Sequence, residues 1–434
     1  MQATIETIST LERRLKVSLP MQEVDSEVDN RLRRMARTVR MHGFRPGKVP
    51  FKLVEKQYGG QIRQEVLGDI LQKSFGEAIR QKNLRVAGYP RFEANQEAGG
   101  QGNFEYNATF EVYPEVKLGA MENVEIKRPA VNVGEPEVDK TIEILRKQRA
   151  SYLPVEREAQ KGDRVLLDFE GKREGAPFEG GVGKDHMVLV GENRYLADFE
   201  ANVVGVAKGQ SKQFELTFPA DYHAPDLAGK PVVFDIQVKE VAQTVLPEVD
   251  AEFAKQLGIA DGDVARLRED VRANLQREVS RRIQARVKDQ VMKSLHDTSE
   301  IEVPKSLVEM EVDRLRNEMT ENLRSRGGEA PAELPKELFE TEAKRRVALG
   351  LIIAELVRVQ DLQAKPEQLK EIVAEHAQSY EKPEEVVRWY YQSQERLREV
   401  ESLALENNVV SWVLGASKVE DVPTDFDELM GNRT

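Results

Sequence analysis

Apolar and polar residues alternate in different ways in different parts of the chain. Over 5–17 they alternate with a period of two, which predicts a strand, and a helix follows, entered near Pro20. Two more helices are expected over 51–57 and 61–82, and then a hairpin around the glycines at 99–102. The stripe of the first helix consists of Val24, Val28, Leu32, Met35 and Val39. Residues 1–112 are therefore predicted to form a mixed α/β domain.

The next two segments have shorter periodic elements. Residues 113–150 read as a linker, because Pro114, Pro129 and Pro136 interrupt any regular pattern before a helix over 136–150. Residues 151–243 contain short alternating stretches separated by glycine and proline turns. The clearest alternation places Val232, Phe234, Ile236 and Val238 on one face. This segment predicts a compact antiparallel β domain.

Residues 244–434 are predicted to be almost wholly helical. The longest stripe recurs mostly every four residues and consists of Val264, Leu267, Val271, Leu275, Val279, Ile283, Val287, Val291 and Leu295. Since four exceeds 3.6, this stripe winds around the helix and meets several neighbours in turn. The whole chain is thus expected to be an α+β multidomain protein that ends in an elongated all-α domain.

The composition of the chain excludes several kinds of catalytic and metal site. The 434 residues are 40% hydrophobic, 32% charged and 6% aromatic, which is typical of a folded, helix-rich protein. There is no cysteine, so disulfides, thiolate nucleophiles and Cys-based zinc sites are excluded. The five histidines are scattered, and neither a metal site nor a cofactor is expected. No apolar stretch approaches the length of a membrane span, and residues 1–20 lack the pattern of a signal peptide.

One basic segment stands out against a net charge of −12. Residues 31–52 hold eight Lys or Arg and no acidic residue. Its tip contains two glycines and two prolines, which predict a stiff, exposed turn: Gly43, Phe44, Arg45, Pro46, Gly47, Lys48, Val49 and Pro50. An aromatic residue beside arginines suits an RNA-rich or acidic protein partner. Alternatively, the arginines only complement a helix C-terminus and Phe44 folds inward.

The run GFRPGKVP, preceded by an arginine-rich helix, resembles the signature loop by which trigger factors dock on the large ribosomal subunit beside the polypeptide exit tunnel. The resemblance implies that residues 43–48 bind the ribosome, through a ribosomal protein and ribosomal RNA, with Phe44 and Arg45 at the contact positions. It also implies that nascent and unfolded polypeptides are partners. Pro46 departs from the basic residue common in the family, and Lys48 supplies charge nearby.

A second resemblance covers residues 162–241. The runs DFEG, PFEGG, NRYLADFE, FPADYH and VFD occur in the order found in FKBP-type prolyl isomerases. The resemblance implies a proline pocket lined by Phe169, Phe178, Tyr195, Leu196, Phe199, Tyr222, His223 and Phe234. It makes Tyr222 the donor to the substrate carbonyl and places His223 at the border. Alternatively, the aromatic residues serve only as the core of a small β domain, as Phe234 could on its strand.

The chain departs from the isomerase family at one pair of residues, and the sequence leaves more than one function open. Family members often have Pro-Gly where this chain has Ala197 and Asp198, so a slower turnover is expected. The favoured function is a ribosome-associated chaperone with isomerase activity. The alternatives are a plain isomerase whose helices only dimerise and a scaffold whose β domain is inactive. The stripe around Val308 and Val312, with Met310 offset, either meets clients or packs on the next helix. A weak homodimer off the ribosome is compatible with the acidic surface.

Overall fold

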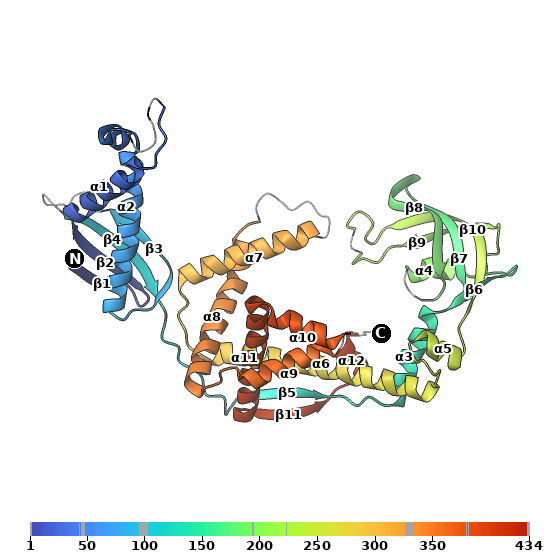
Figure 1. Cartoon of the computed structure of the whole chain (residues 1–434). Coiled ribbons are helices and arrows are strands. Elements are labelled where there is room, and N and C mark those ends of the chain that lie inside the picture. Colours follow the sequence, from blue (N-terminus) through green and yellow to red (C-terminus); the bar gives the residue numbers. More distant parts are fainter. Residues whose placement is uncertain are drawn as a thin grey trace. The chain divides into compact units, whose positions relative to one another are not determined.

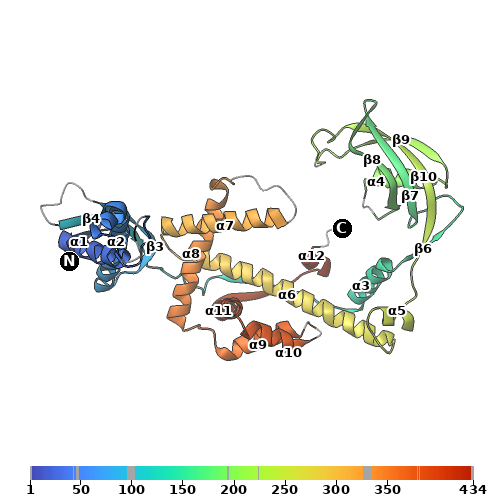
Figure 2. The ribbon, with the colours of Figure 1, turned by 45° about the horizontal axis from the view of Figure 1, so that its top comes forward.

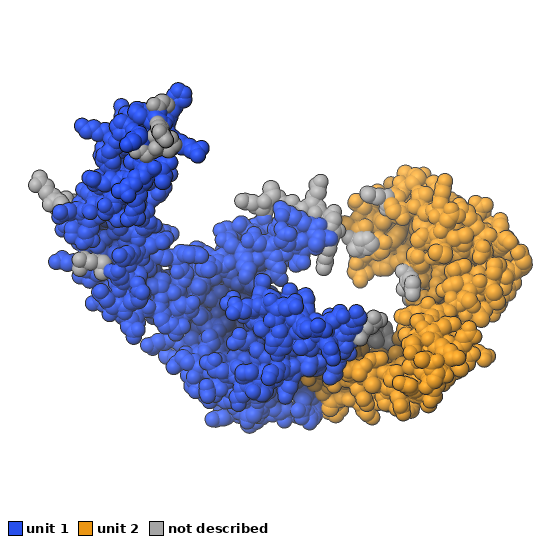
Figure 3. Space-filling view, in the orientation of Figure 1, with its two compact units in different colours: residues 1–128, 285–422 blue, residues 129–284, 423–434 orange. Residues whose placement is uncertain are grey.

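The computed structural model describes residues 2–42, 44, 48–94, 103–192, 195–222, 224–325, 334–378, 380 and 382–431. The chain divides into two compact units, shown in two colours in Figure 3. Unit 1 comprises residues 1–128 and 285–422, and unit 2 comprises residues 129–284 and 423–434. Each unit is therefore assembled from two separate stretches of sequence.

The first part of unit 1 is a four-stranded antiparallel sheet with two helices (Figure 1). The strands are β1 (Gln2–Thr7), β2 (Glu12–Pro20), β3 (Val86–Ala94) and β4 (Asn103–Val112), in the order β1-β2-β4-β3. The single strand expected over 5–17 is wrong, because β1 and β2 form a hairpin. Ile8 donates its N–H to Glu12 at 3.0 Å, and Glu12 donates its own to the hydroxyl of Ser9 at 3.0 Å. Short polar side chains of this kind stabilise turns.

The helices of this part are α1 (Met21–Ala36) and α2 (Phe51–Gln81). The two separate helices expected over 51–57 and 61–82 are one continuous helix. Gly59 and Gly60 lie in its middle, where each lowers helix propensity by about 1 kcal/mol relative to alanine. Burial on both sides of the glycines outweighs this cost, because Val54, Ile62 and Val66 of α2 pack against the apolar stripe of α1.

The remainder of unit 1 is mostly helical (Figure 2). Its helices in this part are α7 (Lys305–Ser325), α8 (Glu337–Gln360), α9 (Pro366–Ala377), α10 (Pro383–Tyr391) and α11 (Gln394–Ala416). Val312 and Leu315 of α7 are buried against Ala343 of α8. The stripe around Val308 and Val312 thus packs on the next helix, as the second alternative stated. Met310 and Met319 stay 46% and 45% exposed.

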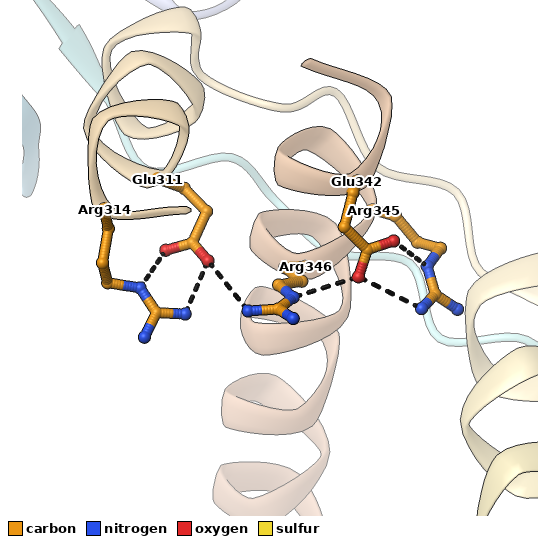
Figure 4. A network of polar contacts seen from close by, with 5 residues as sticks. All are labelled: Glu311, Arg314, Glu342, Arg345 and Arg346. Atoms are coloured by element: carbon orange, nitrogen blue, oxygen red, sulfur yellow. Dashed lines mark hydrogen bonds and ion pairs between the residues drawn. The ribbon is translucent and has the colours of Figure 1, made fainter. Parts of the chain in front are cut away.

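A chain of charges also joins α7 and α8 (Figure 4). Glu311 accepts two hydrogen bonds from Arg314, at 2.6 and 2.8 Å, and lies 3.7 Å from Arg346. Arg346 in turn donates to Glu342 at 3.0 Å, and Arg345 donates to the same carboxylate. Hydrogen bonds from Arg345 and Arg346 lower the pKa of Glu342. Arg346 therefore links a carboxylate on each helix.

The start of α7 is capped by a residue of the N-terminal sheet. Glu111 on β4 accepts hydrogen bonds from the backbone N–H of Lys305 at 3.1 Å and of Ser306 at 2.7 Å. The Ser306 hydroxyl lies 2.6 Å from the same carboxylate. Gly88 on β3 makes this approach possible, since a Cβ there would lie 2.5 Å from the Ser306 side chain, and its φ is +73°. The contact satisfies helix N-terminal donors that would otherwise be unpaired.

Unit 2 contains the predicted antiparallel β domain. Its strands are β6 (Ser151–Pro154), β7 (Arg164–Arg173), β8 (Ala176–Leu189), β9 (Ser211–Thr217) and β10 (Pro231–Val245). The order is β6-β10-β7-β8, and β9 also pairs with β10. Helix α4 (Ala197–Val203) adds Phe199 and Val203 to the core under this sheet. The large apolar residues that alternate on β10 are buried there, as its pattern predicted.

One ion pair stabilises a turn of this domain from within. Asp163 is 3% exposed, and both its carboxylate oxygens accept from the Arg157 guanidinium, at 2.5 and 3.0 Å. The N–H of Gln160 donates to Asp163 at 2.9 Å. Burial by itself raises the pKa of Asp163, but the bonds from Arg157 and Gln160 outweigh it and leave the pKa lowered.

The remaining elements are α3 (Glu135–Gln148), α5 (Ala251–Gln256), α6 (Val264–Thr298), α12 (Phe426–Met430) and a ribbon of β5 (Glu125–Ala130) with β11 (Lys418–Pro423). Arg128 of β5 binds Asp421 of β11 through two hydrogen bonds, at 2.6 and 3.0 Å. Helix α6 is continuous. Its winding stripe is confirmed at Leu267, Val279 and Val291, which are all buried. The α+β multidomain class expected from the sequence is confirmed.

Candidate functional site

The basic segment emerges from the packed pair of α1 and α2. Val49 is 7% exposed and joins the core between these helices, and Val39 and Met41 pack against the same cluster. Phe44 donates its N–H to the carbonyl of Met41 at 3.1 Å, yet its side chain stays 39% exposed. The alternative in which Phe44 folds inward is therefore wrong.

Of the other predicted docking residues, the structure describes only Lys48. Lys48 is exposed. Gly43, Arg45, Pro46 and Gly47 lie outside the described residues.

The cations of this segment fall into two groups. Arg31 binds Glu27 and Asp69, at 3.2 and 2.6 Å, and Arg33 binds Asp29 at 2.8 Å. In the described part of the chain, five others are exposed and form no ion pair: Arg34, Arg37, Arg40, Lys48 and Lys52. Positive charge that is not neutralised within the protein is available to a phosphate or an acidic surface.

Seven of the eight predicted pocket residues surround one cavity of about 470 Å³. They are Phe169, Phe178, Tyr195, Leu196, Phe199, Tyr222 and Phe234. His223 lies outside the described residues. Three residues that the sequence interpretation did not assign to the pocket also line it, namely Gly180, His186 and Phe218.

The floor of the cavity is built from rings held edge to face. Phe234 on β10 contacts Phe199 of α4 with centroids 5.3 Å apart and an interplanar angle of 79°, and Phe178 of β8 at 6.1 Å and 87°. Phe169 on β7 contacts Phe199 at 6.0 Å. Gly171 leaves room for them, since a Cβ there would lie 2.6 Å from the ring of Phe178 and 2.8 Å from that of Phe234. This explains the glycine in the DFEG run.

Helix α4 sets one side of the cavity. Ala197 and Asp198 form its first turn, and Phe199 donates its N–H to the carbonyl of Leu196 at 2.9 Å. The next residue, Glu200, is only 3% exposed and accepts from the N–H of Gly191 at 2.7 Å and of Tyr195 at 3.1 Å. With Ala197 and Asp198 in place, Phe199 still reaches the cavity. The slower turnover expected for this pair stays a prediction.

Three of the residues that line the cavity, Tyr222, His186 and Tyr195, carry polar groups. Tyr222 contacts Phe218 with ring centroids 4.5 Å apart. Nε2 of His186 lies 2.8 Å from the hydroxyl of Tyr195, and the His186 ring contacts that of Phe169 with centroids 5.3 Å apart. The alternation of β8 could have found His186, because it shares a face with the buried Val188, whereas Met187 between them is 59% exposed. The resemblance pointed to His223 as the histidine at this pocket and did not point to His186.

No group of three or more His, Asp or Glu in the described ranges could hold a metal ion. Within the same ranges, every helix is too short or too polar to cross a bilayer.

Family models match three parts of the chain. The model described as bacterial trigger factor protein matches residues 1–145, and the model of its C-terminus matches residues 263–415. The model described as FKBP-type peptidyl-prolyl cis-trans isomerase matches residues 155–239. The match to the isomerase model includes the described residues of the aromatic cavity.

Relatives agree over the full length. A trigger factor of Aromatoleum aromaticum is 53% identical over 434 residues, with 100% of both chains covered. One of Thiobacillus denitrificans is 50% identical over 431 residues, covering 99% of this chain and 100% of its own. One solved structure shares the fold, with a TM-score of 0.50 and 20% sequence identity over 96% of this chain and 99% of its own. It is described as "Promiscuous Substrate Recognition in Folding and Assembly Activities of the Trigger Factor Chaperone". The chain thus belongs to the bacterial trigger factor family of ribosome-associated chaperones and carries an FKBP-type peptidyl-prolyl cis-trans isomerase domain.

Proposed function

We propose that residues 43–48 dock the chain on the large ribosomal subunit near the exit tunnel, through a ribosomal protein and ribosomal RNA. The observation that carries this proposal is the exposed Phe44, 39% accessible, on a loop whose base is held by the buried Val49. The unpaired cations Arg37 and Arg40 precede it and supply attraction to phosphate. An apolar tip surrounded by positive charge gives both an orienting contact and long-range attraction.

The docking proposal is tested by replacing Phe44, Arg45 and Pro46 with alanines. We expect the variant to lose co-sedimentation with ribosomes at low salt and to keep its isomerase activity, because the two sites belong to different domains. The matched control is Lys82→Ala, because Lys82 is an exposed cation just beyond the other end of α2. Substitution of an acidic residue such as Glu105, Glu111 or Asp69 is not used as the control. Loss of both activities together in the triple variant would contradict this assignment.

The aromatic cavity is proposed as the site where X–Pro bonds rotate. Rotation passes through a twisted bond without amide resonance, with a barrier of ~20 kcal/mol in water. The planar ground state has the more polar carbonyl. A cavity floored by Phe199 and Phe234, each 6% exposed, solvates that carbonyl poorly and so favours the twisted state relative to the planar one. Tyr222 donates to the carbonyl, and His223 borders the site. This chemistry requires no nucleophile.

A pair of matched substitutions tests the cavity. Phe178 lines it, whereas Phe214 lies in the same core, 9% exposed, without lining it. We expect Phe178→Leu to lower kcat/KM on a short proline peptide at least roughly tenfold, since it removes a pocket wall. Phe214→Leu should lower the melting temperature and leave kcat/KM within about twofold. Equal kcat/KM of the two variants would contradict the assignment of the cavity as the isomerase site.

The parts of the chain divide the work in this proposal. Residues 1–112 dock, 113–150 connect, 151–243 isomerise and 244–434 bind clients. Exposed apolar residues on the helices, such as Met310 at 46% and Trp389 at 50%, support weak and varied client contacts. When the chain is truncated after Val245, the last residue of β10, we expect loss of client protection against aggregation with isomerase activity retained.

Location and assembly follow from the same proposal. We place the chain in the bacterial cytoplasm, where ribosomes release nascent polypeptides. Off the ribosome it forms at most a weak homodimer, because a net charge of −12 opposes self-association. Sedimentation velocity over a range of concentrations at physiological salt measures this directly. A tight dimer at nanomolar concentration would favour the plain dimeric isomerase.

A further inference from the structure

Two polar side chains meet on one flank of the aromatic cavity. His186 of β8 and Tyr195 are in hydrogen-bond contact, Nε2 to hydroxyl, at 2.8 Å, and their rings meet edge to face with centroids 5.5 Å apart. The Tyr195 hydroxyl also lies 3.4 Å from the carbonyl of Met187, which is a much longer contact. Each side chain is therefore the other's main polar partner within the described part of the cavity.

This wall is held from a second side by a buried carboxylate. Glu200 accepts from the backbone N–H of Tyr195 and of Gly191, and it is 3% exposed. It follows Phe199 in α4, so the helix that delivers the floor residue also fixes the backbone of Tyr195. His186 is fixed in turn by Phe169, whose ring it meets at 83°. The Tyr195 ring is thus positioned through both its backbone and its hydroxyl.

We propose that His186 and Glu200 are positioning residues that hold Tyr195 as one wall of the proline cavity, and that the His186–Tyr195 pair makes this wall accept an apolar residue next to the proline. The proposal deepens the proposed isomerase function and rests on it. The pair lines the same cavity as Tyr222, which packs on Phe218 and is the proposed donor to the substrate carbonyl.

The preference follows from the pairing of the polar atoms. While the two side chains satisfy each other, an apolar substrate residue covers ring surface without leaving a donor or acceptor unpaired. If one partner is lost, the same substrate buries an unsatisfied polar atom, which costs binding free energy. A polar substrate residue can bind that atom itself and is affected less. If both partners become apolar, no polar atom is left and the cost disappears.

The experiment is a double-mutant cycle in the full-length chain with His186→Phe, Tyr195→Phe and the double variant. The substrates are two peptides that differ only in having Leu or Gln before proline. We expect each single variant to raise KM for the Leu peptide about fivefold, as the loss of one hydrogen bond implies, and to raise KM for the Gln peptide by a smaller factor. The double variant should be clearly less impaired on the Leu peptide than the product of the two single effects. Singles without effect, or a double variant as impaired as the product of the singles, would overturn the proposal.

Two further variants separate a failure of this inference from a failure of the proposed function. Glu200→Gln keeps one carbonyl acceptor and should be affected less than Glu200→Ala, with KM rather than kcat changed in both. Equal effects of the two would remove Glu200 from the proposal. If Phe178→Leu leaves activity intact, the cavity is not the isomerase site at all. If Phe178→Leu is impaired and the cycle shows no coupling, only the role of His186 falls. Thermal unfolding of each variant checks that it folds.

Discussion

The cap that Glu111 places on α7 can be removed by a single substitution, Glu111→Ala. Helix α7 begins at Lys305, and two of its first backbone donors end on this carboxylate, at 3.1 and 2.7 Å. Replacing a capping acceptor with alanine costs about 0.5–2 kcal/mol, and a carboxylate at a helix N-terminus adds a favourable charge–dipole contribution. We therefore expect local opening of the first turn of α7 to become easier by about 2 kcal/mol.

The assay is hydrogen exchange of the amides at 305–309, followed by mass spectrometry. A change of about 2 kcal/mol in local opening corresponds to roughly 30-fold faster exchange. Glu111→Gln keeps an acceptor and loses the charge, so a smaller acceleration, roughly fivefold, is expected. The control is Glu105→Ala on the same strand, whose carboxylate accepts from Ser18 at 3.3 Å instead of from α7. Unchanged exchange in Glu111→Ala would refute the view that the N-terminal sheet holds this helix end in place.

Two other changes have outcomes that follow from burial and charge. Arg346→Ala breaks the link between α7 and α8, but because its side chain is 42% exposed we expect the free energy of unfolding to fall by less than about 1 kcal/mol. Leu315→Ala, at a site 8% exposed, should lower it by about 2–5 kcal/mol. Urea unfolding compares the two variants, and a larger loss for Arg346→Ala would contradict this ranking. Because the pKa of Asp163 is lowered on folding, its stabilising contribution is present above the unfolded value, about 3.9, and is lost as pH falls through the folded value. Asp163→Asn should thus lower the melting temperature near neutral pH and flatten its decline below about pH 4, and an unchanged acid limb would argue against the Arg157 pair.

The cavity could be predicted in large part from the sequence because aromatic residues recur in short runs with a familiar order. Those runs do not say which aromatic side chains face inward from a loop, and Phe218, which follows β9, lines the cavity although the sequence pattern did not indicate it. His186 could have been found from the alternation of β8. Its pairing with Tyr195 could not, since the two come from different elements and meet only through tertiary packing.

Secondary structure could be predicted from the sequence where the apolar periodicity alone decides it. The stripe of α6 indicated the long helix correctly, whereas α2 was divided at Gly59 and Gly60 because local propensity was given more weight than burial. The opposite error joined β1 to β2, because the alternation of apolar residues hid the turn beside Ser9. In the first case the deciding contact is tertiary packing, and in the second it is a single hydrogen bond. The periodicity of apolar residues indicates neither of them.

The ribbon of β5 and β11 has a consequence for how the chain itself is made. Arg128 and Asp421, which join its strands, are 293 residues apart in sequence. During synthesis the N-terminal sheet and the β domain are complete long before β11 leaves the tunnel, so until then β5 is an unpaired edge that other extended segments can join. Pairing of β5 with β11 therefore comes late in the maturation of this chaperone, and a stalled chain that ends before residue 418 leaves β5 as an unpaired edge strand.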